Sequence, residues 1–433
     1  MLTRFSKTVQ PRCSRKCSTI LGVIQGASYE HLSEYEEDAS LGHHLDLVFT
    51  VKHQKQRALN HIMRDRLREG RDMKALGGRT PRPYRDGLLV RHALANDVVQ
   101  QMDLKEPFGL DLVGKRFAVA AGDEVRVYDC ESSLAHVYRN PWFAQLHSVH
   151  FSENGKRLLA VSTGFDTVLE FDLTDRKLTW AWNAWDHGYT TSPAGIRLTH
   201  GASGTDATSH NEIVIADPSR WNGFGLPTYL TASHLNNACY GDDDGTILIT
   251  LFHQGRAVIV ERDSGKPQEV MTDLLNPHGF EPGWQGDYLV TDTRRGRVIF
   301  FDGDLAVRCV LTIDGCEPTD SRAGMGEWLQ NVLHLQSGLY AAIDIHRSCI
   351  WLFEPETKRR RKVEVSQDWA VQNVIAVERE RLAELRRRPD QFPLIHHEVA
   401  DPEGLMTVPA TSSTAFRDSD FSEVCPSVAQ GRG

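Results

Sequence analysis

The sequence predicts an all-β protein, a β-propeller of five or six four-stranded blades with helical extensions at both ends. The first observation is a repeat between residues 147 and 354, where a polar residue, a turn, an apolar strand, a second turn and another apolar strand recur. The second is the period of about 40 to 50 residues, which is typical of propeller blades. The third is that the copies open with a histidine or a glutamine, at His147, His234, His278 and Gln330.

The composition limits the partners of the chain. Its 49 basic and 58 acidic residues give a formal charge of −9, and no basic stripe indicates a nucleic-acid surface. No apolar run approaches the roughly 18 residues that a membrane span needs. The 8 cysteines include no CxxC pair, so neither a zinc knuckle nor a disulfide framework is expected. We therefore expect a small-molecule substrate, no nucleic acid and no membrane span, and the oligomeric state stays open.

The N-terminal part is expected to lie outside the propeller. Residues 1–30 are basic, with no acid before Glu30. This composition predicts the basic tail of a cytoplasmic protein or, alternatively, an organellar transit segment. Residues 31–86 are expected to form a helical extension and a linker, because apolar residues after His53 recur at helical spacing.

The propeller is expected to span residues 87–366. A weaker copy of the repeat, without a histidine, begins at Phe108. The irregular stretch 186–231 is too long for an ordinary loop, which favours a lid-like insertion or a degenerate blade. Residues 367–433 are expected to form a C-terminal helix and a disordered tail, because helical spacing from Val377 precedes a segment rich in Ser, Thr, Pro and Asp.

The repeats also predict a ring of side chains at one end of the central channel. Alignment on the second strands places His147, His234 and His278 at the starts of the first strands. Gln330 takes the equivalent place in the last copy, and His334 lies a turn deeper. The turns between second and third strands lie at the same end, since successive strands are antiparallel. The expected substrate-binding side chains are therefore His253, Arg294, Arg295, Arg347 and Gln330.

Three kinds of function fit these residues. In the favoured one, a metal-dependent oxidoreductase or lyase, His147, His234 and His278 bind a divalent iron, manganese, copper or zinc ion, and His334 or, alternatively, Gln330 completes the set. In the second, a metal-free transferase, the same histidines act as base or nucleophile toward an anion held by Arg294, Arg295 and Arg347. In the third, a noncatalytic interaction module, the histidines only tie turns together by hydrogen bonds.

One family resembles these repeats. Residues 147–182, with an Asn-Gly turn, a strand ending in Glu-Phe-Asp and the sequence Lys-Leu-Thr-Trp-Ala-Trp, are similar to repeats of arylsulfotransferases and related uncharacterised propellers. The openings HLN and PHG strengthen the resemblance, which covers about residues 145–355. It implies a six-bladed propeller in which a channel histidine accepts the sulfuryl group beside an arginine, with His234, His278 and Arg294 at the matching positions.

The chain also departs from that family. Arylsulfotransferases are typically exported, whereas this sequence shows no clear export signal and carries an additional basic N-terminal region. The four-histidine iron propellers, such as the carotenoid oxygenases, provide an analogy for the metal-dependent alternative alone.

Overall fold

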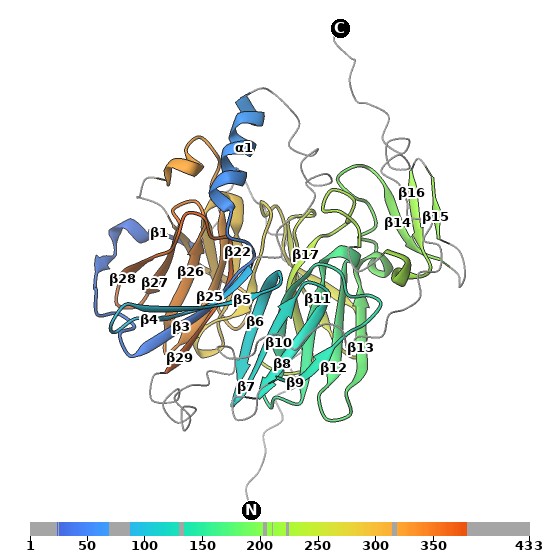
Figure 1. Ribbon diagram of the computed structural model, residues 1–433, viewed down its shortest axis with the longest axis horizontal. Helices are drawn as coiled ribbons and strands as arrows, with labels where there is room; N and C mark the ends of the chain where they lie inside the picture. The colour runs from blue at the N-terminus through green and yellow to red at the C-terminus, as the bar shows by residue number, and fades with distance from the viewer. Residues whose placement is uncertain are drawn as a thin grey trace, which may run out of the picture.

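The computed structural model describes residues 24, 26–68, 87–129, 134–201, 206–209, 211–221, 225–313 and 318–378. Within these residues, six sheets, each with four antiparallel strands, form the blades of a propeller (Figure 1). The predicted fold class is thus confirmed, with six blades.

The strands of each blade are given from the innermost outward. Blade 1 contains β29 (Val371–Glu378), β3 (Leu45–Val51), β4 (Gly87–Ala93) and β5 (Val98–Leu104). Blade 2 contains β6 (Pro107–Val113), β7 (Arg116–Ala121), β8 (Glu124–Asp129) and β9 (Leu134–Tyr138). Blade 3 contains β10 (Leu146–Phe151), β11 (Arg157–Ser162), β12 (Thr167–Asp172) and β13 (Lys177–Asn183). Blade 4 contains β17 (Leu235–Tyr240), β18 (Thr246–Leu251), β19 (Arg256–Glu261) and β20 (Pro267–Met271). Blade 5 contains β21 (Phe280–Pro282), β22 (Tyr288–Asp292), β23 (Arg297–Phe301) and β24 (Val307–Thr312). Blade 6 contains β25 (Leu329–Gln336), β26 (Leu339–Asp344), β27 (Cys349–Glu354) and β28 (Arg359–Glu364).

The innermost strands surround a central channel. Strands β29, β6, β10, β17, β21 and β25 contact one another in this order, and β25 contacts β29 again. The six strands therefore form a closed ring around one axis, as the first strands of a propeller do. We call the end of the channel at which these strands begin the mouth.

The ring is closed by two distant parts of the chain. Strand β29, from the C-terminal side, pairs antiparallel with β3, from the N-terminal side, with Val374 opposite Phe49. Two short strands, β1 (Ser28–His31) and β2 (Glu36–Glu37), add in parallel to the outer edges of blades 5 and 6. Blade 1 thus joins the first and last described strands of the propeller.

The structure assigns more of the chain to the propeller than residues 87–366. The expected helix in the extension 31–86 is present as α1 (Gln56–Arg68), but β3 precedes it and belongs to blade 1. The expected C-terminal helix is replaced, as far as residue 378, by β29, in which Val377 is buried. Pairing with β3 outweighs the helical spacing, because this strand buries its β-branched residues in the closing blade. The rest of the predicted C-terminal helix and the tail lie outside the described residues.

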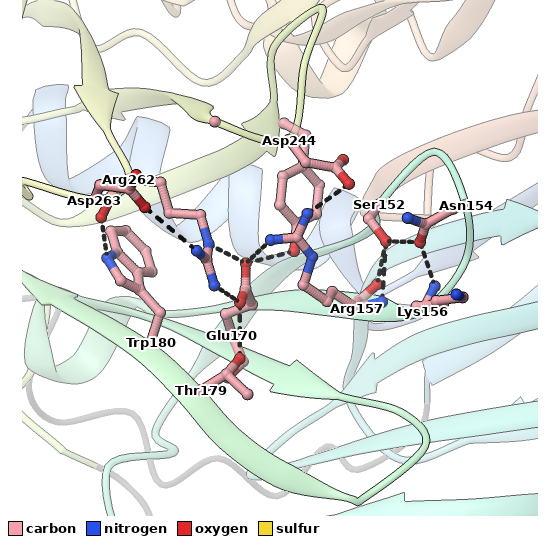
Figure 2. Close-up of polar contacts among 12 residues, drawn as sticks. Ser152, Asn154, Lys156, Arg157, Glu170, Thr179, Trp180, Asp244, Arg262 and Asp263 are labelled. Atoms are coloured by element: carbon pink, nitrogen blue, oxygen red, sulfur yellow. Dashed lines mark hydrogen bonds and ion pairs between the residues drawn. The ribbon is translucent and has the colours of Figure 1, made fainter.

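Apolar layers and polar contacts hold neighbouring blades together. Between blades 3 and 4 the buried core includes Val161, Trp182 and Ile249. On the same interface the fully buried Glu170 accepts hydrogen bonds from Arg262 Nη2, at 2.7 Å, and from Tyr240 Oη, at 3.0 Å (Figure 2). A buried carboxylate is stable only when it is paired in this way.

The stretch 186–231 forms a small separate sheet. Its strands are β14 (Arg197–His200), β15 (Ala207–Thr208) and β16 (Glu212–Ile215), with β14 and β16 parallel. It is therefore an insertion between blades 3 and 4 and not a degenerate blade. Figure 1 shows this sheet and α1 on the same side of the disc. Among the described residues, no helix has the length and apolar character needed to cross a bilayer.

Candidate functional site

The innermost strands share a bulge at the mouth. In β10, His147 is the extra residue between the pairs Leu146–Ser162 and Ser148–Val161. Bulges re-aim side chains and are frequent beside active sites. The residues at this bulge position, from blade 1 to blade 6, are Gln372, Phe108, His147, Asn236, His278 and Gln330.

The structure corrects the predicted place of His234. This residue lies two positions before Asn236, so it does not share the bulge position of His147 and His278. Its backbone is left-handed, with φ of 50°, like that of Gln145, with φ of 51°. The sequence alignment matched His234 to His147, whereas the strand register matches Leu235 to Leu146, two residues away from that alignment.

Asp166 holds the backbone that carries His234. Its fully buried carboxylate accepts the backbone N–H groups of Ala232, Ser233 and His234, at 2.7, 3.1 and 2.6 Å. The indole Nε1 of Trp185 donates to the same carboxylate at 3.0 Å. Four donors to one carboxylate offset the cost of the left-handed backbone, which is about 1 kcal/mol for a residue with a side chain. Asp166 was visible in the sequence at this turn, but nothing there indicated its role.

Aromatic rings form a continuous arc around the mouth. His147 and His234 lie 5.3 Å apart by ring centroids, whereas Phe252 stands between His234 and His278, at 5.2 Å from each. The complete arc, with each ring in contact with the next, is Phe108, His147, His234, Phe252, His278 and Trp328. The three predicted histidines thus share the mouth without converging on one point.

The expected four-histidine metal set is not formed. In the described parts of the chain, no group of three or more His, Cys, Asp or Glu residues is placed to hold a metal ion. His334 faces away from the ring, because its side chain contacts the rings of Trp284 and Tyr340, between blades 5 and 6. It pairs with Tyr340 one residue beyond the position that matches His150.

The hydrogen bonds of the histidines set their tautomers. His147 Nδ1 lies 2.8 Å from the carbonyl oxygen of Gln145, which can only accept, so this nitrogen carries the proton. His278 Nδ1 is likewise 3.3 Å from the carbonyl of Asn276 and 2.8 Å from Thr293 Oγ1. The basic nitrogen of each ring is then Nε2.

His234 follows the same rule through a hydroxyl group. Thr231 Oγ1 donates to the carbonyl of Thr228 at 2.8 Å, so it accepts from His234 Nδ1 at 3.3 Å. Within the described residues, Nε2 of His234 and Nε2 of His278 make no hydrogen bond. Two imidazoles therefore present lone pairs in fixed orientations.

Burial keeps these imidazoles neutral. It lowers the pKa of His278 to about 4 and holds the pKa of His234 well below its usual range, and the Lys52 ammonium acts in the same direction on both. The pKa of His253 is also lowered by burial, and its Nε2 donates to the carbonyl of Thr228 at 2.8 Å. Each neutral imidazole keeps a lone pair that can accept a hydrogen bond or, when a negative charge forms nearby, a proton.

Lys52 and Asn236 are site residues that sequence reasoning missed. Lys52 directly follows β3, and its Nζ lies 4.3 Å from the centroid of the Phe108 ring. Asn236 is 5% exposed, and neither its Oδ1 nor its Nδ2 has a hydrogen-bond partner among the described residues. A buried amide without partners indicates a bound molecule or water. Only the strand register identifies Asn236, and only the ring closure brings Lys52 to the mouth.

Two of the predicted substrate-binding arginines are occupied by carboxylates. Arg347 binds Glu327 at 2.9 Å and Asp344 at 3.1 Å, and Arg295 binds Asp292 at 2.9 Å. These ion pairs stabilise the turns of blades 5 and 6. Arg294 is exposed, and the described residues provide no ion pair for it.

The predicted Gln330 is one of three amide side chains at the bulge position, with Gln372 and Asn236. Its Oε1 accepts from Trp328 Nε1 at 2.8 Å, and its Nε2 donates to Gln372 Oε1 at 3.3 Å. One turn deeper, His150 Nε2 meets Asn237 Oδ1 at 3.1 Å, and Asn237 Nδ2 donates to Glu281 at 2.9 Å. Burial raises the pKa of Glu281.

Comparisons with known proteins give solved structures of low similarity. No protein-family model and no curated protein matches the chain. Similar solved structures include virginiamycin B lyase from Staphylococcus aureus, with 10% identity over 60% of this chain and 70% of that chain at a TM-score of 0.39. A streptogramin B lyase has 8% identity over 64% of this chain and 76% of that chain, at a TM-score of 0.42. A nidogen/laminin complex has 8% identity over 76% and 98%, at a TM-score of 0.47. No property of the chain is inferred from these likenesses, and the resemblance to arylsulfotransferases stays a prediction.

Proposed function

We propose that the mouth binds a small organic molecule with a carbonyl or anionic group, and that a neutral histidine there removes a proton from it without a metal. The observation that carries this proposal is the buried Asn236 amide, which has no partner among the described residues, beside imidazoles held neutral. Buried polar groups in a concave ring that lack partners are satisfied by ligands or water.

The other side chains of the mouth suit such a molecule. The rings of Phe108, Phe252 and Trp328 offer apolar faces beside the histidines. The Lys52 ammonium favours negative charge on the ligand or charge that develops during reaction. Asn236 can both donate to and accept from a polar substituent.

His278 is the better placed base. In the proposed step its Nε2 takes a proton from the substrate, and the electron pair of the broken bond stays on the substrate, facing Lys52. Thr293 and the carbonyl of Asn276 accept the Nδ1 proton and thereby stabilise the imidazolium that forms. A pKa of about 4 makes the free base weak, but the negative charge formed on the substrate raises it during the step.

The experiment combines ligand binding with proton exchange. A panel of small carboxylates and carbonyl compounds is tested by thermal shift on the wild type, Asn236→Ala and the control His43→Gln, which replaces an exposed histidine. Bound compounds are then incubated in D₂O, and deuterium at the acidic position is measured by NMR. We expect stabilisation that Asn236→Ala loses, and deuterium exchange that His278→Gln loses while binding persists. Ligands that stabilise Asn236→Ala as much as the wild type would refute the site.

A transition-metal enzyme is the second candidate. The observation in its favour is that His147, His234 and His278 each direct Nδ1 to a protein acceptor, an arrangement that metal-binding histidines share. Imidazoles are ligands of iron, manganese, copper or zinc, but in the described structure the three rings are not grouped to hold an ion, so this candidate requires them to move together on metal binding. Elemental analysis of the purified protein decides between the candidates: a stoichiometric metal that His234→Ala loses supports this one and contradicts the metal-free step.

A further inference from the structure

A buried arginine beside the mouth forms no ion pair with the described residues. Arg322 ends the short helix η8 (Asp320–Arg322) and is 4% exposed. Its Nη2 donates to the carbonyl of Gly326 at 3.2 Å, and its Nη1 lies at 3.5 Å from Asn60 Oδ1. Its Nε has no partner, and no carboxylate in the described residues forms an ion pair with it. This guanidinium therefore keeps unused hydrogen-bonding capacity in a buried position.

Asn60 provides a second unused donor at the same place. It lies on α1, which contacts η8, and it is 1% exposed. Its Oδ1 accepts from Gln56 Nε2 at 2.6 Å and faces Arg322, whereas its Nδ2 has no partner in the described part of the chain. Two buried donor atoms thus await an acceptor.

Arg294 adds a second positive charge. A Cβ placed on Gly326 would meet Arg294 Nη2 at 3.7 Å, so both guanidinium groups flank this glycine. The nearby carboxylates of Glu327 and Asp344 are both held by Arg347. Burial lowers the pKa of Arg322 to about 10, the charges of Asp344 and Glu327 oppose this lowering, and the charge of Arg294 adds to it. Within the described residues, Arg347 is the guanidinium that pairs directly with these two carboxylates, and neither Arg322 nor Arg294 forms an ion pair.

We propose that Arg322, Arg294 and Asn60 form a binding site for a small oxyanion: a carboxylate, sulfate or phosphate. A buried charge without a partner is costly, and guanidinium groups bind oxyanions through paired N–H donors. The site borders the mouth, because Gly326 is two residues from Trp328, whose ring contacts His278. It does not depend on the proton transfer proposed above, since the anion is recognised by other residues.

The test measures the unfolding temperature of the full chain against added sodium sulfate, phosphate or acetate, with ionic strength held constant by sodium chloride. We expect a saturable rise in the wild type. Arg294→Gln should weaken the apparent affinity at least about tenfold, since a hydrogen bond to a charged group is worth this much. The matched control is Arg295→Gln, on the same turn, whose arginine is already paired with Asp292. It should keep the wild-type affinity.

A second variant separates ligand binding from a structural role. Arg322→Met should lose the saturable response and, without an oxyanion, unfold at a temperature no lower than the wild type, because it removes an uncompensated buried charge. If this variant does not fold, Arg294→Gln still decides. A preference for sulfate and phosphate indicates a tetrahedral anion, and a preference for acetate indicates a carboxylate. No response, or a linear rise that is equal in the wild type and Arg294→Gln, would overturn the proposal, because it would be a general salt effect.

Discussion

The neutral state of His278 predicts a specific loss of stability in acid. The unfolded chain takes up a proton on this residue near pH 6.5, whereas the folded protein does so only near pH 4. Because the pKa in the folded state is the lower one, the stabilisation is complete above pH 6.5 and is lost as the pH falls to 4. The difference between these pKa values corresponds to about 3 kcal/mol at 1.36 kcal/mol per unit. The side chain is 8% exposed, so solvent screening is small.

Urea unfolding of the wild type and His278→Gln between pH 7.5 and pH 4 measures this quantity. The substitution also removes ring contacts, but that loss is independent of pH. The difference in unfolding free energy between the two proteins should therefore shrink by about 3 kcal/mol over this range. His43→Gln, at an exposed position, controls for the loss of a histidine as such. A difference that stays constant with pH would show that His278 is solvated in the folded protein and would refute the reasoning.

Three further substitutions test the supports of the site. Glu170→Gln should lower the unfolding free energy by about 3 kcal/mol, because it leaves Arg262 without its buried partner; a loss below about 1 kcal/mol in urea unfolding would mean that the contact is solvated. Asp166→Asn places an amide N–H₂ against backbone donors, so we expect the unfolding free energy to fall by about 2 kcal/mol and ligand binding to weaken because His234 is displaced. Unchanged ligand binding would argue against a positioning role of Asp166. Val374→Asp places a carboxylate in β29, where Val374 is 1% exposed, and should abolish cooperative unfolding in calorimetry; a sharp transition near the wild-type temperature would contradict closure by this strand.

The blades were predictable because their signal is local. The inner three strands of blades 3 to 6 are apolar runs separated by turn residues, and the structure places strands there. The ring closure was not predictable, because β29 and β3 lie about 320 residues apart and each adjoins a charged segment. A helix-like spacing around Val377 then misled the sequence reading.

The site residues could be predicted only in those blades whose sequence alignment agrees with the strand register of the structure. His147 and His278 occupy the same bulge position, as expected, whereas His234 reaches the mouth from two residues earlier with a left-handed backbone. The bulge is a backbone property that spacing does not reveal. The ion pairs of Arg295 and Arg347 were missed because their partners Asp292 and Asp344 are the last residues of strands, and repeat spacing does not show which side chains pair at a turn.

The central claim, that the mouth holds neutral imidazoles with basic Nε2 atoms, is tested most directly by histidine-selective ¹H–¹⁵N NMR with His278→Gln and His234→Gln as assignment variants. The account predicts that both residues are neutral at pH 7 with the proton on Nδ1, and that His278 stays neutral down to about pH 4. A protonated ring, or a proton on Nε2, at pH 7 would contradict it.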